Sequence, residues 1–161
     1  MNKTALAVLL AVFIATPVEA ADKYAGIKLG KSRHNITGVI NTPAAFGVFG
    51  GYTINTNLAV EAEYIDLGNL GNNKATAADV SALFFYPGDE PFSLYAKISY
   101  ASSTWKVLGQ AQHNSSFTHG LGFRYNTSPS TSIRFAWDRY MIGNPDVLNV
   151  DVLNVAGIFR F

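Results

Sequence analysis

The sequence predicts an all-β fold, an eight-stranded antiparallel up-and-down barrel that spans a membrane. Three observations predict it. The chain divides into segments of about ten residues bounded by turn residues, and in several segments apolar and polar residues alternate. Only 14% of the 161 residues are charged, whereas 8 Tyr, 11 Phe and 2 Trp are present. Beyond the N-terminal region, no stretch is long and apolar enough to form a transmembrane helix.

The N-terminal residues have the pattern of a secretory signal peptide. A positive charge precedes the apolar run Ala5–Ala15, and small residues follow at the positions that a signal peptidase reads. The run is shorter than the roughly 20 apolar residues that a membrane-spanning helix needs. We therefore expect residues 1–20 to be removed, with cleavage after Ala20 or Ala21, and residues 21–161 to form one barrel domain.

The remaining chain contains eight candidate strands, each bounded by turn-forming residues. In chain order they are Tyr24–Arg33, Ala45–Ile54, Leu58–Asp66, Asp79–Pro87, Phe92–Ala101, Phe117–Asn126, Ser132–Ile142 and Leu148–Phe161. Alternation is clearest in the third, fifth, sixth and seventh. In the fifth, for example, Phe, Leu, Ala, Ile and Tyr alternate with Ser, Tyr and Lys. Because successive side chains of a strand point to opposite faces, these segments have one apolar and one polar or small-residue face.

The same alternation fits a lipocalin-like barrel with its apolar face inward, but three features favour lipid outside. The polar face is poor in charge and rich in Gly, Ser and Ala. Tight turns at Asn55–Asn57, Gly88–Glu90 and Thr127–Ser130 alternate with connections that are mostly longer. Rings gather in two belts near the strand ends: Tyr52, Tyr86, Phe92, Tyr125 and Phe161 near the turns, and Tyr64, Tyr100, Trp105, Phe117 and Tyr140 near the longer connections.

The sequence resembles the OmpA-like transmembrane domain family and the small opacity-type surface proteins. The resemblance rests on Phe49-Gly50-Gly51-Tyr52 before a tight turn, on the alternating segment Leu58–Tyr64 and on the ending Gly157-Ile158-Phe159-Arg160-Phe161. It implies an eight-stranded barrel in the outer membrane of a Gram-negative bacterium, exported through its signal, with both termini in the periplasm.

The family resemblance also implies a C-terminal signal that the outer-membrane assembly machinery reads during insertion. Phe161 and Phe159 match the aromatic positions of that signal, and Asn154 matches the polar position at its head. One departure is present, because Ala156 occupies the usual glycine position and Gly157 follows it. We expect these residues to make the chain a substrate of the assembly machinery.

When the polar face is followed through all strands, eight charged residues fall in the barrel interior: Lys28, Glu61, Glu63, Lys97, Arg124, Arg134, Asp138 and Arg160. An eight-stranded barrel is just wide enough to be filled by its own side chains. Buried charges persist when they are paired, and Arg is suited to bidentate pairing with carboxylates. We therefore expect an ionic network that fills the lumen. Exchange of its pairs would alternatively gate a narrow, low-conductance pore.

Several function classes find no support in the sequence. A net charge of +1 gives no sign of nucleic-acid binding, and the absence of cysteine excludes disulfides and thiol chemistry. The histidines (His34, His113 and His119) lack metal-ligand spacing, so we expect no metal or other cofactor. His113–Ser116 places a His near serines in an expected polar loop, but no acidic residue lies nearby to complete a hydrolase triad.

We therefore expect a non-enzymatic outer-membrane barrel that contributes to envelope integrity and surface properties. The alternative is a narrow porin, and a surface-interaction protein or a lipid A-modifying enzyme fits less well. Outer-membrane lipids and lipopolysaccharide are the expected partners, because Lys and Arg suit phosphate contacts and five cations fall near the longer connections: Lys31, Arg33, Lys74, Lys106 and Arg139. No sequence feature names a further surface ligand.

Overall fold

The computed structural model describes residues 22–36, 39–70, 73–88, 90–107, 110–141 and 149–161. The expected signal peptide and its cleavage site lie outside the described residues. The strands are β1 (Asp22–Ile36), β2 (Val39–Asn41), β3 (Ala44–Asn55), β4 (Leu58–Leu70), β5 (Asn73–Tyr86), β6 (Phe92–Val107), β7 (Gln110–Asn126), β8 (Thr131–Met141) and β9 (Asn149–Arg160). In the described part of the chain, no helix is long and apolar enough to cross a membrane.

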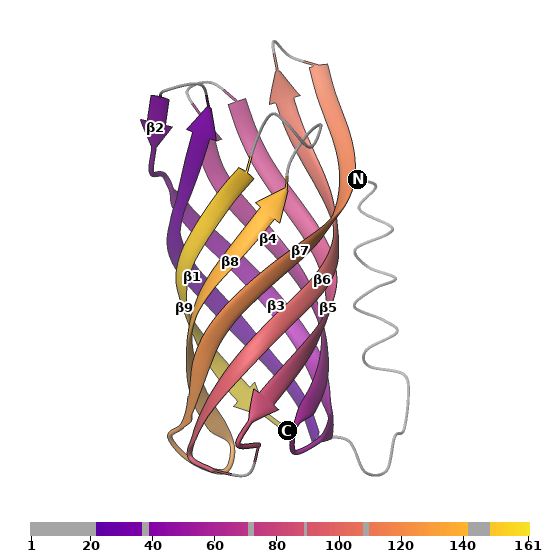
Figure 1. Ribbon diagram of the computed structural model, residues 1–161, viewed down its shortest axis with the longest axis vertical. Coiled ribbons are helices and arrows are strands. Elements are labelled where there is room, and N and C mark those ends of the chain that lie inside the picture. The colour runs from indigo at the N-terminus through magenta and orange to yellow at the C-terminus, as the bar shows by residue number, and fades with distance from the viewer. Residues whose placement is uncertain (1–21, 37–38, 71–72, 89, 108–109, 142–148) are drawn as a thin grey trace.

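The strands form one sheet that closes on itself (Figure 1). From β3 to β9 each strand pairs antiparallel with the next, and β1 pairs with both β3 and β9. The short β2 pairs with the far end of β1, so β2 and β3 together line β1 as one strand interrupted at Thr42 and Pro43. The predicted eight-stranded antiparallel barrel is therefore confirmed. Closure leaves no open edge where the strands form the barrel wall, which a lipid environment requires.

The two ends of the barrel differ (Figure 1). Tight turns join β3 to β4, β5 to β6 and β7 to β8 at one end, which we call the turn end. The first residues of β1 and the last residues of β9 also lie at this end. There the Phe161 N–H donates a hydrogen bond of 2.9 Å to the Lys23 carbonyl. We call the opposite end the loop end.

Five strands, β1, β4, β5, β6 and β7, extend farther toward the loop end than the sequence predicts. The β6–β7 ladder runs from Phe92 opposite Tyr125 to Val107 opposite Gln110. The loop predicted at His113–Ser116 is therefore wrong, because these residues belong to β7. The predicted strand ends coincide with the points where apolar alternation along the sequence stops. Alternation marks contact with lipid, whereas backbone pairing continues into hairpins whose side chains no longer face lipid.

An apolar band encircles the outer face of the barrel. Leu29 on β1 and Leu153 on β9 are 58% and 70% exposed, and similar residues lie on β3, β5, β6, β7 and β8. So large an exposed apolar surface is unfavourable in water but matches the hydrocarbon of a bilayer. The apolar face thus points outward, opposite to a lipocalin-like barrel. The band includes Ile27, Leu29, Phe46, Val48, Val80, Phe84, Leu94, Ile98, Leu121, Phe135, Leu153 and Val155.

Exposed aromatic rings lie near both borders of the apolar band. At the turn end they are Tyr86, Phe92, Tyr125 and Phe161. Toward the loop end, Tyr100 and Phe117 make an edge contact with ring centroids 5.4 Å apart. Two rings predicted for this belt lie elsewhere, because Tyr140 is buried in the interior and Trp105 packs against interior residues. Tyr140 shares the inner face of β8 with Asp138, so alternation along the strand places it inside.

Candidate functional site

The side chains in the barrel interior are stacked in three layers. Along β5 the order from the turn end is Phe85 and Leu83, then Asp79, then Ala77. The lower apolar layer contains Tyr24, Phe49, Ala59, Leu83, Phe85, Tyr95, Ala136, Ala156 and Ile158. The upper apolar layer contains Ala45, Ile65, Leu67, Ala75, Ala77, Ala101, Tyr140, Val150 and Val152. Between them lies the ionic layer, formed by Lys28, Glu63, Asp79, Lys97 and Asp138.

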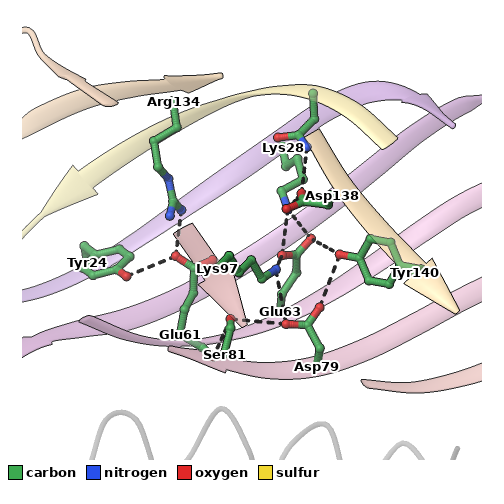
Figure 2. A network of polar contacts seen from close by, with 11 residues as sticks. Tyr24, Lys28, Glu61, Glu63, Asp79, Ser81, Lys97, Arg134, Asp138 and Tyr140 are labelled. Atoms are coloured by element: carbon green, nitrogen blue, oxygen red, sulfur yellow. Dashed lines mark hydrogen bonds and ion pairs between the residues drawn. The ribbon is translucent and has the colours of Figure 1, made fainter. Parts of the chain in front are cut away.

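Glu63 on β4 is the centre of the ionic layer and is 2% exposed (Figure 2). The ammonium groups of Lys28 on β1 and Lys97 on β6 lie 2.7 and 2.8 Å from its carboxylate oxygens. The hydroxyl of Tyr140 on β8 lies 3.4 Å from Glu63 Oε1 and 3.3 Å from Asp79 Oδ2, so it can donate to either carboxylate. One carboxylate therefore joins three strands that are not its neighbours in the sheet.

Asp138 on β8 connects the ionic layer to β1 and β9 (Figure 2). Its Oδ2 atom accepts hydrogen bonds from Lys28 Nζ at 3.1 Å and from Asn154 Nδ2 at 2.8 Å. Asn154, which the sequence assigns to the insertion signal, is thus an interior residue with a buried amide. Charge-assisted bonds of this kind offset the cost of burying the carboxylate.

Asp79 on β5 is a fourth interior carboxylate that the sequence reasoning did not include. Its Oδ1 atom lies 3.3 Å from Lys97 Nζ and accepts a hydrogen bond of 3.3 Å from Ser81. β5 carries apolar residues on both faces, with Leu83 inside and Phe84 outside. Because the polar face is hard to distinguish in such a strand, alternation alone gave no clear signal for Asp79.

Arg134 on β8 forms a separate pair with Glu61 inside the lower apolar layer (Figure 2). Its Nη2 atom donates to Glu61 Oε2 at 2.7 Å, and the Tyr24 hydroxyl donates to the same oxygen at 3.1 Å. The guanidinium carbon lies 4.5 Å from the centre of the Phe49 ring and 5.7 Å from that of Tyr95. Aromatic faces stabilise a desolvated guanidinium, so this cation is held by a carboxylate and by rings together.

The other two predicted interior arginines lie nearer the turn end. Arg124 is buried, donates to the Gly88 carbonyl at 3.0 Å and to Ser93 at 3.2 Å, and stacks 4.0 Å from the centre of the Phe85 ring. Arg160 is only half-buried. It donates to Asn126 Oδ1 at 2.8 Å and lies at the mouth of the barrel instead of in its interior.

The buried charges of the described residues balance. Four cations, Lys28, Lys97, Arg124 and Arg134, accompany four carboxylates, Glu61, Glu63, Asp79 and Asp138. Each carboxylate has a cation within 3.3 Å, and the one cation without a carboxylate partner, Arg124, binds a carbonyl and a ring. Such a network holds its side chains in fixed positions.

The predicted insertion-signal residues other than Asn154 face outward on β9 or follow it. Phe159 and Phe161 are exposed, and their rings are parallel within 24° with centroids 6.5 Å apart. A side chain at Gly157 would meet nothing within 4 Å. The two rings therefore lie side by side as exposed apolar groups at the turn end.

In the described part of the chain the histidines lie in different surroundings. His113 is exposed and its Nδ1 atom lies 3.1 Å from the Thr104 hydroxyl. His34 is buried, with its Nε2 atom 2.9 Å from the Ser32 hydroxyl and 3.1 Å from the Leu67 carbonyl. Among the described residues, no three His, Asp or Glu side chains are grouped to hold a metal ion.

The predicted rim cations fall into two groups. Lys74 is paired with Asp66 at 2.6 Å, and Arg139 makes two bonds to Asp151, of 2.7 and 3.1 Å. Lys31 and Arg33 are exposed on β1, and no described side chain pairs with them. The side chain of Lys106 lies outside the described residues.

The sequence was compared with models of known protein families. It matches the family model described as "Outer membrane protein beta-barrel domain" over residues 4–161. The chain belongs to this outer-membrane β-barrel family. The resemblance to OmpA-like barrels that the sequence suggests is therefore confirmed, and the location in a bacterial outer membrane follows from the family and the fold.

Proteins similar in sequence to the chain include outer membrane protein A of two bacteria. The protein of Escherichia coli O157:H7 is 28% identical over 180 residues, covering 91% of this chain and 52% of the relative. The protein of Salmonella typhi is 28% identical over 196 residues, covering 100% of this chain and 56% of the relative. The chain thus spans about half the length of these relatives.

Solved structures of the same fold include Neisserial surface protein A, with a TM-score of 0.70 and 17% identity. Another is Ail, the attachment invasion locus protein of Yersinia pestis, with a TM-score of 0.61 and 19% identity. Each alignment covers 88% of this chain and 99% of the other. At these identities the likeness establishes the shared barrel fold alone.

Proposed function

We propose that this protein is a non-enzymatic structural component of the outer membrane that contributes to envelope integrity and surface properties, with a lumen closed to solutes. The observation that carries the proposal is the stacking of the interior. The ionic layer lies between two apolar layers, so a hydrated ion would have to cross polar and apolar barriers in turn. An eight-stranded barrel leaves little room for such a path.

The proposed orientation places the turn end in the periplasm and the loop end at the cell surface. Short periplasmic turns and longer outer extensions are the usual arrangement of such barrels. The β4–β5 and β6–β7 hairpins, which extend beyond the apolar band, would then be the surface-exposed parts of the protein. Both ends of the barrel chain, Asp22 and Phe161, would lie in the periplasm.

We expect the refolded barrel to give no discrete single-channel currents in a planar bilayer. The Arg134→Ala variant is expected to be silent too, because the upper apolar layer around Ile65 and Leu67 stays in place. Insertion is checked by the change in gel mobility on boiling, and a known channel-forming barrel serves as the positive control. Discrete steps in the native protein that change with Arg134→Ala would instead establish the alternative, a narrow pore gated by the ion pairs. An altered lipid A mass on expression would contradict the non-enzymatic role.

We also propose that Phe159 and Phe161 act as the recognition signal for outer-membrane insertion. Replacing Phe161 with Ala is expected to lower the amount of folded barrel in cells several-fold, since the exposed ring offers an apolar contact to the assembly machinery. The same variant should refold in detergent as well as the native chain, because the ring makes no interior contact. Tyr86→Ala, which removes an exposed ring elsewhere at the turn end, is the control. An equal loss of folded barrel in Phe161→Ala and Tyr86→Ala would contradict the proposed role of Phe161 in the insertion signal.

A further inference from the structure

The outer face of β1, β9 and β8 carries a row of charged residues immediately beyond the apolar band. The strand register places Arg33 opposite Asp151, and Asp151 opposite Arg139. One step closer to the band, Lys31 lies opposite Leu153. Because partners in register point to the same face, these side chains share one patch at the loop-end border of the band.

The only carboxylate of this row is already engaged. Arg139 donates from Nε to Asp151 Oδ1 at 2.7 Å and from Nη2 to Oδ2 at 3.1 Å, and its guanidinium carbon lies 5.0 Å from the centre of the Trp137 ring. Both oxygens of the Asp151 carboxylate thus face Arg139. Lys31 and Arg33 are two exposed cations without an ion-pair partner among the described residues.

The surroundings of Lys31 and Arg33 are apolar on the membrane side. Leu153, 70% exposed, lies beside Lys31 in register, and Leu29, 58% exposed, lies one step closer to the centre of the band. Lys31 and Arg33 are two residues apart on one face, which separates their Cα atoms by roughly 7 Å. The patch therefore presents two cations for an anion and an adjoining apolar surface for hydrocarbon. On another part of the rim, by contrast, Asp66 neutralises Lys74.

We propose that this patch binds the phosphate of a phosphorylated glycolipid of the outer leaflet, with Lys31 and Arg33 contacting the phosphate and the acyl chains lying along Leu29 and Leu153. Lys and Arg are strong donors to phosphate oxygens, and partial exclusion of water at the bilayer surface strengthens the attraction. The inference rests on the proposed orientation, in which the loop end faces outward. A free phosphate ion would gain the charge contacts but not the apolar ones.

The test measures lipid retention by native mass spectrometry on the folded mature barrel released from detergent micelles. The probes are bis-phosphorylated lipid A, the same lipid A without phosphates, and inorganic phosphate. We expect the native barrel to retain the phosphorylated lipid about tenfold more tightly than the dephosphorylated one, and Lys31→Gln/Arg33→Gln to lose this preference. Lys31→Arg/Arg33→Lys should keep it, because the charges remain. Lys74→Gln/Lys106→Gln, which removes two cations from the other hairpins, is the matched control and should also keep it.

Two results would overturn the lipid site. One is an equal preference for phosphorylated lipid in the native barrel and in Lys31→Gln/Arg33→Gln. The other is displacement of the lipid by inorganic phosphate at equal concentration, which would indicate a site for free anions. The measurement does not depend on conductance, so a conducting barrel would contradict the closed lumen and leave this result unchanged. Folding of every variant is checked by gel mobility before lipid is added.

Discussion

Replacing Glu63 with Gln is expected to lower the free energy of unfolding of the barrel by about 3–5 kcal/mol, the cost of breaking a buried ion pair by removing one partner. Glu63 binds Lys28 and Lys97 at 2.7 and 2.8 Å and is buried. Without its charge, the interior holds one more cation than carboxylates, and Lys28 and Lys97 each lose their closest anion. Urea titration of the barrel refolded in lipid vesicles, followed by gel mobility, measures the change.

Two further variants separate the loss of the Glu63 charge from unrelated effects. Glu90→Gln removes an exposed carboxylate at the turn end and should change stability by less than about 0.5 kcal/mol. Glu63→Gln/Lys97→Met restores the charge balance and leaves Lys28 paired with Asp138. Asp79 loses its cation but keeps the hydrogen bonds from Ser81 and Tyr140, so the double variant is expected to recover roughly 1 kcal/mol. Equal stability of Glu63→Gln and Glu90→Gln would mean that water solvates the interior charges. That result would contradict the proposed closed lumen.

Adding one methyl group at Gly51 is expected to destabilise the barrel by about 1–3 kcal/mol, the usual cost of overpacking. Gly51 on β3 lies opposite Tyr24 on β1, whose ring covers it. A Cβ atom at this position would lie 2.5 Å from the Tyr24 ring and 2.7 Å from the Val60 carbonyl oxygen. The ring would have to move, and its hydrogen bond to Glu61 would be lost with it.

The neighbouring Gly50 provides a control for Gly51→Ala on the same strand. A Cβ atom at Gly50 would meet only the Tyr24 carbonyl oxygen, at 3.6 Å, which is ordinary van der Waals contact. Gly50→Ala should therefore be close to neutral in the urea titration. Equal destabilisation by the two substitutions would mean that backbone conformation, and not the Tyr24 ring, determines the requirement for glycine at Gly51.

Alternation along the strands was sufficient to place most of the interior charges. Glu61 and Glu63 alternate with apolar residues on β4, and Arg134 and Asp138 do so on β8, so the side of the sheet follows from period two alone. Which cation binds which carboxylate could not be predicted, because it depends on the offset between strands far apart in the sequence. The pairing of Lys28 with Asp138 spans 110 residues and depends on barrel closure.

The sequence was least informative where the contrast between faces is weak. Asp79 was missed because Leu83 and Phe84 make both faces of β5 apolar. Tyr140 was assigned to an interfacial belt because aromatic residues commonly occur there. It lies instead in the upper apolar layer, where its hydroxyl reaches Glu63 and Asp79. The two apolar layers could not be predicted, since Ala75, Ala77 and Val150 form a layer only after the barrel curves them together.

The location of the ion pairs also constrains how the barrel can assemble. Lys28 reaches Asp138 across β9, and Glu61 reaches Arg134 from the far side of the sheet, so neither contact exists until β1 has met β9. Before that seam forms, the concave face of an open sheet carries charges that hydrocarbon cannot solvate. An inserting chain must therefore keep that face hydrated, and the water can leave only as the first and last strands join.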